Sequence, residues 1–353
     1  FDHPRLAAQA ARIEELRASP QAPPPLSPAT AVAGDVPPLS FAQERLWLLD
    51  RLVPERAVYN LPELLDAGAR LDLARLERSL LELVRRHEVL RTTFAVRGGV
   101  PVQEVHGALR PGITLVELRD RREARRLAAR EAARPFDLER GPLLRAVVLR
   151  LDDRDLLLLN RHHIVSDAGS QEVFRRELAA LYDGRSLPQL PLRYADFAVW
   201  QRRRLAGSVR ERLASFWRRR LDGLRALDLP TDRPRPAVES HRGALRSRPP
   251  AAGLGEALRG LGRAAGATLF MTLVAGFTAL LGRIAQQRDP AVGTPVSHRH
   301  QPQLEGLIGL FLNTLVLRAD LRRRPSFREH TARIRDTALD AFAHQELPFE
   351  RLV

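Results

Sequence analysis

Residues 161–170 read Arg161-His162-His163-Ile164-Val165-Ser166-Asp167-Ala168-Gly169-Ser170, and they place two histidines and an aspartate between a strand and a helix. The apolar run Leu156–Leu159 predicts a buried strand before them, and helical spacing begins near Gln171. Neighbouring strand side chains point to opposite faces, so both histidines enter one cavity only if the strand has ended. We therefore expect one histidine for chemistry and one for structure. The alternative is that both are ordinary histidines and that Asp167 merely caps the helix.

Five further stretches follow in a fixed order along the chain. They are Ser40–Trp47 (SFAQERLW), Arg86–Phe94 (RHEVLRTTF), Tyr194–Gln201 (YADFAVWQ), Ile308–Thr314 (IGLFLNT) and His344–Glu350 (HQELPFE). With the histidine stretch they resemble the condensation domain of nonribosomal peptide synthetases, a member of the HHxxxDG acyltransferase superfamily, and the resemblance spans residues 37–353. The chain departs from this pattern at Ala168, where the family has glycine. Because glycine serves positions of positive φ, Ala168 would strain the turn only if its φ is positive.

The resemblance implies a fold of the α/β (α+β) class. Two chloramphenicol-acetyltransferase-like lobes would form a V-shaped pseudodimer with the active site in the tunnel between them. We expect the second lobe to be C-terminally incomplete. The expected parts are the last helix of a carrier protein (1–17), a Pro/Ala-rich linker (18–38), the N-terminal lobe (39–220) and the C-terminal lobe (221–353).

Local patterns give the same organisation in outline. Residues 5–17 have helical spacing, and residues 18–38 hold many prolines and too few apolar groups to dock on a lobe. Helices and strands then alternate, which predicts mixed sheets covered by helices. The spacing predicts helices over 73–84 and 268–283, and strands over 143–151, 155–165, 291–297 and 311–318.

Composition excludes several classes of protein. The 353 residues are 44% hydrophobic and 28% charged, which is typical of a globular protein. The chain has no cysteine, so it holds no disulfide, thiolate nucleophile or Cys-ligated zinc. No apolar run reaches the ~20 residues of a membrane span. The chain begins with Phe1 and shows no signal-peptide pattern, so we expect a cytoplasmic piece of a longer protein.

The net charge of +15 raises the question of nucleic-acid binding. All 57 basic residues are arginine, a bias that a GC-rich coding sequence explains better than selection for charge. The arginines are spread along helical segments without interleaved aromatic residues that would stack on bases. We therefore expect no nucleic-acid partner. Docking of acidic carrier proteins and their phosphorylated arms is a better use for part of this charge.

The resemblance implies amide formation between two carrier-bound thioesters, with no metal and no directly bound cofactor. The phosphopantetheine arms of the carriers would act as handles for the substrates. His163 matches the family's catalytic histidine and would face the attacking amine. His162 would be structural, donating a hydrogen bond within the turn, and Asp167 would brace the site through an ion pair with Arg299. Further candidates are the oxyanion or turn donors Gly169 and Ser170 and the tunnel residues Asn313 and Thr314.

The partners that this interpretation implies are the upstream and downstream carrier domains and an adenylation domain. Two other functions stay open. An epimerisation domain shares the double histidine but differs in the other stretches. A catalytically silent domain would keep the fold and recruit partner proteins, and Ala168 is the only residue that favours it.

Overall fold

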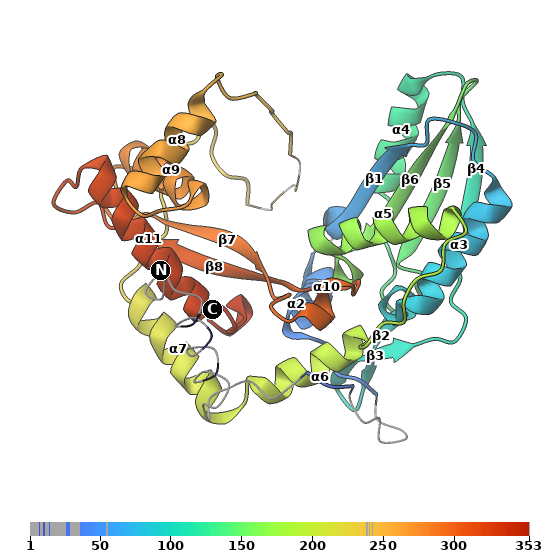
Figure 1. Ribbon diagram of the computed structural model, residues 1–353, viewed down its shortest axis with the longest axis horizontal. Helices are drawn as coiled ribbons and strands as arrows, with labels where there is room; N and C mark the ends of the chain where they lie inside the picture. The colour runs from blue at the N-terminus through green and yellow to red at the C-terminus, as the bar shows by residue number, and fades with distance from the viewer. Residues whose placement is uncertain are drawn as a thin grey trace.

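The protein is V-shaped, with two lobes joined at its base (Figure 1). The computed structural model describes residues 36–53, 56–237, 239, 241 and 243–352, together with Ala7, Ala10, Glu14 and residues 26–28. Most of the predicted carrier helix, residues 5–17, lies outside these described residues. Two lobes of mixed helix and sheet confirm the expected fold class.

The first lobe is built on a four-stranded sheet of order β1-β6-β5-β4, in which only the β4–β5 pair is parallel. A separate hairpin, β2–β3, lies below it. The elements of this lobe are α2 (Phe41–Leu52), η1 (Arg56–Tyr59), β1 (Asn60–Asp66), α3 (Leu73–Arg86), η2 (Glu88–Arg91), β2 (Thr92–Arg97), β3 (Val100–Val105), β4 (Ile113–Glu117), α4 (Arg121–Ala132), β5 (Leu144–Arg150), β6 (Asp155–His162), η3 (His163–Val165), α5 (Ala168–Tyr182) and α6 (Tyr194–Arg204).

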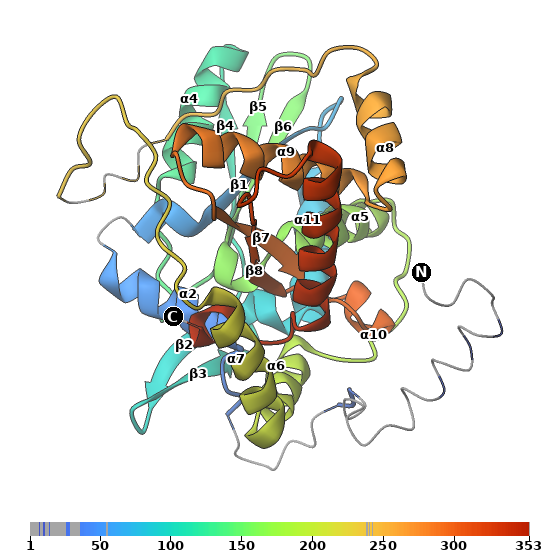
Figure 2. The same ribbon diagram turned by 90° about the vertical axis from the view of Figure 1, so that its left-hand side faces the viewer.

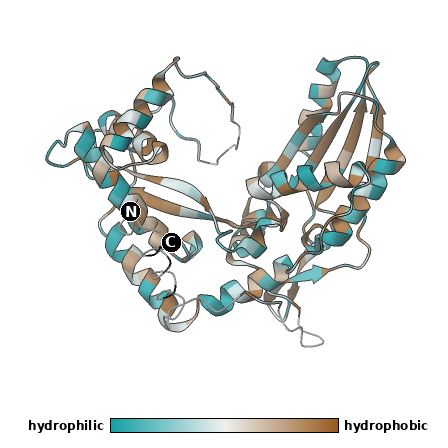
Figure 3. Cartoon of the chain, in the orientation of Figure 1, coloured by the Kyte–Doolittle hydropathy of each residue, from teal (hydrophilic) through white to brown (hydrophobic). Residues whose placement is uncertain are grey.

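Helices cover both faces of this sheet, which explains why β6 is buried throughout and carries a continuous run of four leucines, Leu156–Leu159. Leu157 and Leu159 belong to the core shared with α3 and α5, whereas Leu156 and Leu158 belong to the smaller core beneath α4. Figure 3 shows the strands of this sheet as the most hydrophobic part of the lobe. A strand with two covered faces has no reason to alternate polar and apolar residues. The predicted strands over 143–151 and 155–165 are thus confirmed within a few residues.

The second lobe contains less β-sheet than the first. Its antiparallel pair, β7–β8, packs with α9 and α11 around a separate core. Its elements are α7 (Gly207–Leu221), α8 (Leu254–Ala264), α9 (Leu269–Ile284), β7 (Ala291–Ser297), α10 (Pro302–Glu305), β8 (Leu312–Arg318), α11 (Phe327–Ala343) and η4 (Phe349–Arg351). The helix predicted over 268–283 and the strands predicted over 291–297 and 311–318 are confirmed.

The two lobes exchange segments across their boundary. Leu213, Ala214 and Trp217 of α7 are buried in the core of the second lobe, so the boundary predicted at residue 220 is wrong and lies close to Leu205. In the other direction, the chain from α10 to the start of β8 packs into the first lobe. Its side chains Leu304, Leu307, Ile308, Leu310 and Phe311 are all buried in the main core of that lobe.

The segment predicted as a detached linker contacts the first lobe at its described residues. Leu26 is buried in the main core. The carbonyl oxygens of Pro37 and Pro38 accept hydrogen bonds from the backbone and side-chain amides of Gln103, at 2.9 and 2.7 Å. The expectation that residues 18–38 hold too few apolar groups to dock is therefore wrong at these points.

Among the described helices, none is by itself both long and apolar enough to cross a bilayer. The adjacent pair α8 and α9 meets that criterion only when the two are joined, and they are bent by 96° where they meet.

Candidate active site

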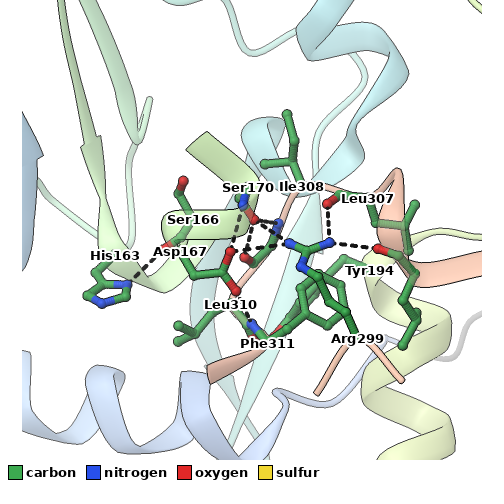
Figure 4. Close-up of polar contacts among 12 residues, drawn as sticks. His163, Ser166, Asp167, Ser170, Tyr194, Arg299, Leu307, Ile308, Leu310 and Phe311 are labelled. Atoms are coloured by element: carbon green, nitrogen blue, oxygen red, sulfur yellow. Dashed lines mark hydrogen bonds and ion pairs between the residues drawn. The ribbon is translucent and has the colours of Figure 1, made fainter. Parts of the chain in front are cut away.

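His163 stands where β6 has just ended and the chain turns into η3. Its Nδ1 lies 2.7 Å from the carbonyl oxygen of Ser166. A carbonyl oxygen only accepts, so Nδ1 carries the proton, and Nε2 of the neutral ring is left as an acceptor. The ring is half-buried and points away from the hydrogen-bond network around Asp167 (Figure 4). This is the geometry of a base or hydrogen-bond acceptor held in one tautomer.

His162 is fully buried on the other side of the strand end. Its Nδ1 accepts a hydrogen bond from the backbone N–H of Ile164 at 3.1 Å, and its ring meets Tyr59 and Phe136 edge to face. The ring therefore accepts within the turn, whereas the sequence-based expectation was that it donates. Burial lowers the pKa of His162 to about 3, so the ring is neutral near pH 7 and has a structural position.

The burial of His162 predicts that the protein loses stability in acid. In the unfolded chain a histidine gains its proton near pH 6.5, whereas in the folded chain His162 gains it only at about pH 3. Below pH 6.5 the unfolded state therefore binds more protons than the folded state. The free energy of unfolding decreases as the pH is lowered from 6.5 to about 3. At pH 4.5, two pH units below the unfolded pKa, the loss from this group is about 3 kcal/mol.

Urea unfolding between pH 7 and pH 4 measures this loss. His162→Asn keeps an acceptor for Ile164 but cannot be protonated, so it should flatten the dependence on pH even though it lowers stability overall. An unchanged slope in this variant would show that other groups carry the acid sensitivity.

Asp167 joins the two lobes. Its Oδ1 accepts from the backbone N–H of Ser170 at 2.7 Å, which caps α5, and from Nη2 of Arg299 at 3.2 Å. Its Oδ2 accepts from the backbone N–H of Phe311 at 2.8 Å. The structure thus contains the predicted Asp167–Arg299 ion pair, and the helix cap is present together with it.

Arg299 holds in place the segment of the second lobe, residues 304–311, that packs into the first lobe. Its Nη1 donates to the carbonyl oxygens of Leu304 and Leu307 at 2.6 and 2.7 Å, and its Nη2 also donates to Oγ of Ser170 at 2.7 Å. The guanidinium carbon lies 4.1 Å from the centre of the Phe311 ring. Figure 4 shows these contacts converging on one guanidinium. A half-buried arginine with this many acceptors is a structural clamp.

Gly169 and Ser170 were expected to be oxyanion or turn donors, and for Ser170 the structure shows the second role, a backbone N–H that donates within the turn. The backbone N–H of Ser170 is taken by Asp167, and its hydroxyl bonds to Gly309 and Arg299. A Cβ on Gly169 would lie 3.1 Å from Nε of Arg299, so this glycine provides room for the clamp. Ala168 opens α5 and is not among the residues with positive φ, so the departure from the family pattern causes no backbone strain there.

Three side chains that carried no role in the sequence-based prediction hold the same segment. The Tyr194 hydroxyl donates to the carbonyl oxygen of Leu310 at 2.7 Å and contacts Oγ of Ser40 at 2.8 Å. Nδ1 of His87 accepts from the backbone N–H of Ile308 at 3.3 Å. All three lie in the quoted stretches, which was the available signal. The stretches thus converge on residues 308–311.

The packing of Tyr194 leaves no space for a side chain at position 309. A Cβ on Gly309 would lie 2.0 Å from the tyrosine ring, and that ring is fixed by its hydrogen bonds and by Phe311. We expect Gly309→Ala to cost at least 1–3 kcal/mol of unfolding free energy, the usual range for an overpacked core. Gly276→Ala is a matched control, because nothing lies within 4 Å of its added Cβ. Equal melting temperatures for the two variants would contradict this account.

The expected tunnel residues are placed differently. Asn313 is buried, and its Nδ2 donates to the carbonyl oxygens of Gln345 and Leu347, both at 2.8 Å. Its Oδ1 accepts from the backbone N–H groups of Thr314 and Phe349 at 2.8 and 3.0 Å. Asn313 therefore fixes the loop before η4, and its amide is not free to line a tunnel. Thr314 is half-buried in β8 opposite Pro295.

Within the described residues, no group of three or more His, Asp or Glu side chains is arranged to hold a metal ion. The site therefore consists of one oriented histidine, His163, supported by a clamp of buried polar groups around Asp167.

Comparison with known sequences identifies relatives of this chain. A family model described as "Condensation domain" matches residues 33–353. A linear gramicidin synthase of Brevibacillus parabrevis is 46% identical over 374 residues, covering 100% of this chain and 5% of that protein. Phosphinothricin tripeptide synthetase PhsC of Streptomyces viridochromogenes is 46% identical over 330 residues, covering 90% of this chain and 30% of that protein. The chain thus spans a small part of these relatives.

Two solved structures have a similar fold. The X-domain from teicoplanin biosynthesis, in a complex with OxyB, is 33% identical with a TM-score of 0.84, and the match covers 93% of this chain and 74% of that one. The first condensation domain of the calcium-dependent antibiotic synthetase, in complex with a substrate analogue, is 25% identical with a TM-score of 0.75. That match covers 90% of this chain and 77% of the other.

Proposed function

The chain belongs to the condensation-domain family of nonribosomal peptide synthetases, and from this premise we propose that it forms a peptide bond between two carrier-bound substrates. The amine of an aminoacyl thioester on a downstream carrier attacks the acyl or peptidyl thioester on an upstream carrier. A C–N bond forms, the C–S bond breaks, and one proton passes from the amine to the departing thiolate. Thioesters are already activated, so this chemistry uses no ATP.

The observation that carries the proposal is the orientation of His163. The bond from Nδ1 to Ser166 presents Nε2 as an acceptor, the form that receives a hydrogen bond from an attacking amine. A model α-amine has a pKa of roughly 7.7–8.0, so a useful fraction is already neutral at physiological pH. His163 therefore positions the amine as well as taking up its proton.

The upstream and downstream carriers would deliver their thioesters on phosphopantetheine arms, and an adenylation domain would load the downstream carrier. The ion pair of Asp167 and Arg299 links the two lobes four residues after His163, which supports a structural role for both residues. Neither member of the clamp has to touch the substrates.

A recruiting role is the second candidate, and one comparison favours it. The X-domain, whose fold this chain shares, was solved as a complex with OxyB, so in that complex the fold binds a partner. An epimerisation domain is the third candidate, because it shares the paired histidines.

One assay separates the three functions. The full-length protein is incubated with an acyl-loaded upstream carrier and an aminoacyl-loaded downstream carrier, and intact carriers are analysed by mass spectrometry. Condensation transfers the acyl group and increases the mass of the downstream carrier. Exchange of the α-hydrogen with deuterium, without transfer, identifies an epimerase. Neither change, from folded protein and fully loaded carriers, rejects both activities and leaves recruitment.

A further inference from the structure

A small cavity lies at the base of the V, between α6 and the chain that joins β7 to α10. It measures about 200 Å³. Its walls come from both lobes, because Trp200 and Arg204 belong to α6, whereas His298 lies just after β7 and Leu304 lies in α10. Both views of the ribbon show α6 and α10 close together (Figures 1 and 2). The lining contains neither the candidate catalytic histidine nor the ion pair that links the lobes.

The wall of the cavity is mostly apolar. The Trp200 ring is held in place because it stacks on Phe197, with the ring centres 6.2 Å apart. The buried side chains of Leu205 and Leu304 also line the cavity. An apolar cavity of ~150 Å³ accommodates a benzene ring. A cavity of about 200 Å³ therefore has room for one aromatic ring with a small substituent.

His298 adds a hydrogen-bond acceptor to this wall. Its Nε2 lies 2.8 Å from the carbonyl oxygen of Gln345, which only accepts, so Nε2 carries the proton of the neutral ring. Burial lowers the pKa of His298 to about 4, so the ring is neutral near pH 7 and Nδ1 keeps its lone pair. No residue in the described part of the chain donates a hydrogen bond to Nδ1. The histidine is therefore available to a ligand that carries an O–H or N–H group.

The charges that line the cavity compensate one another. The Arg204 guanidinium contacts the Glu346 carboxylate twice, with Nε 2.9 Å from Oε2 and Nη2 3.5 Å from Oε1. Burial lowers the pKa of His300 as well, so both imidazoles in the lining are neutral near pH 7. A charged ligand would leave water without gaining an opposite charge, which is costly. The lining therefore favours a neutral ligand over an anion or a cation.

We propose that this cavity binds a neutral phenol, with its ring against Trp200 and the two leucines and its hydroxyl group donating to Nδ1 of His298. Aromatic pairs gain from offset-stacked and edge-to-face contacts, which favours a ring over an aliphatic group of equal size. A phenol hydroxyl has a pKa of about 10, so it keeps its proton near pH 7 and can donate.

A phenol in this cavity also stabilises the junction of the lobes. It contacts α6 on one side and, on the other, the chain that carries Arg299. The carbonyl oxygen of Leu304, whose side chain lines the cavity, accepts a hydrogen bond from Nη1 of Arg299 at 2.6 Å. A ligand that binds only the folded protein raises its stability. The ligand therefore supports the same segment that Arg299 holds in place.

Isothermal titration calorimetry of the full-length protein with p-cresol tests the site. We expect a Kd of about 0.1–1 mM, which a ligand of this size can reach, and a higher melting temperature at saturation. The methyl ether 4-methylanisole lacks the hydroxyl proton and should bind roughly fivefold more weakly, because one neutral hydrogen bond is worth about that factor. His298→Phe keeps a ring but removes the acceptor. It should weaken p-cresol binding roughly fivefold and leave 4-methylanisole binding unchanged.

A second variant locates the ligand. Gln301 lines the cavity and makes no side-chain hydrogen bond that caps α10, so Gln301→Trp should fill the cavity and abolish binding of both compounds. Gln303→Trp is the matched control, because Gln303 is exposed in α10 and does not line the cavity.

N-Acetyltyrosinamide distinguishes two sources of the phenol ring. Binding as tight as that of p-cresol indicates the tyrosine side chain of a polypeptide, whereas exclusion of this larger compound indicates a free phenol. No binding of p-cresol at about ten times the expected Kd, or an equal Kd in the wild type and Gln301→Trp, overturns the site. An equal loss for both compounds in His298→Phe overturns the role of Nδ1. These measurements need no carrier and no peptide-bond formation, so they stand apart from the test of the proposed function.

Discussion

Replacing His163 with alanine should lower the rate of peptide-bond formation by roughly two to four orders of magnitude while the protein stays folded. The hydrogen bond from Nδ1 to Ser166 is local to the turn, so its loss leaves the clamp between the lobes intact. What disappears is the acceptor, Nε2, which in the proposed function receives a hydrogen bond from the attacking amine. Single-turnover transfer between loaded carriers, stopped with acid and analysed by mass spectrometry, measures the rate of the step itself.

His162→Asn is the matched control for this experiment. The two histidines are adjacent, but the His162 ring packs against Tyr59 and Phe136 and is fully buried. We therefore expect His162→Asn to lower the unfolding midpoint and to keep most of the transfer rate. A folded His163→Ala protein that transfers at nearly the wild-type rate would remove the histidine from the mechanism.

Replacing Asp167 with alanine should destabilise the protein before it affects the chemistry. The substitution leaves the Arg299 charge half-buried without its partner and removes the acceptors for Ser170 and Phe311. Breaking a buried pair on one side costs on the order of 3–5 kcal/mol. Urea unfolding followed by circular dichroism measures the loss, and limited proteolysis should show early cleavage near residues 300–311.

Asp183→Ala is the control for Asp167→Ala. Asp183 ends the same helix but is exposed, and surface substitutions of this kind usually change stability by less than about 0.5 kcal/mol. The opposite pattern, a wild-type unfolding midpoint with little remaining activity in Asp167→Ala, would instead assign the carboxylate a direct part in the reaction.

The sequence predicted the elements of the fold better than their arrangement. The apolar run in β6 and the spacing in α9 are local patterns, and local patterns locate strands and helices. The apolar face of α7 is equally visible, but periodicity does not say which core it will cover. The boundary at residue 220 failed for this reason, since α7 packs in the second lobe.

Prediction from sequence was limited in the same way for the hydrogen-bond partners of the site residues. The Asp167–Arg299 pair was predicted from the family resemblance, which implies an arginine of the second lobe opposite this aspartate, and the ion pair is present. The role of Asn313 depends on which backbone groups lie beside it, and these come from residues 345–349. Likewise, His162 accepts instead of donating because the nearest backbone group is an N–H, that of Ile164. Long-range packing decides such contacts, and no spacing in the sequence encodes them.

The exchange of segments between the lobes restricts how this domain can be recombined with another. A chimaera that joins the first lobe of one domain to the second lobe of another at residue 220 would import a foreign inserted segment at residues 299–311. That segment would arrive without the Asp167, Ser170 and Tyr194 that match it. A junction at residue 220 would also separate α7 from the core that buries Trp217. Whole domains, or the inserted segment together with its first-lobe contacts, are therefore the units that can be exchanged between synthetases.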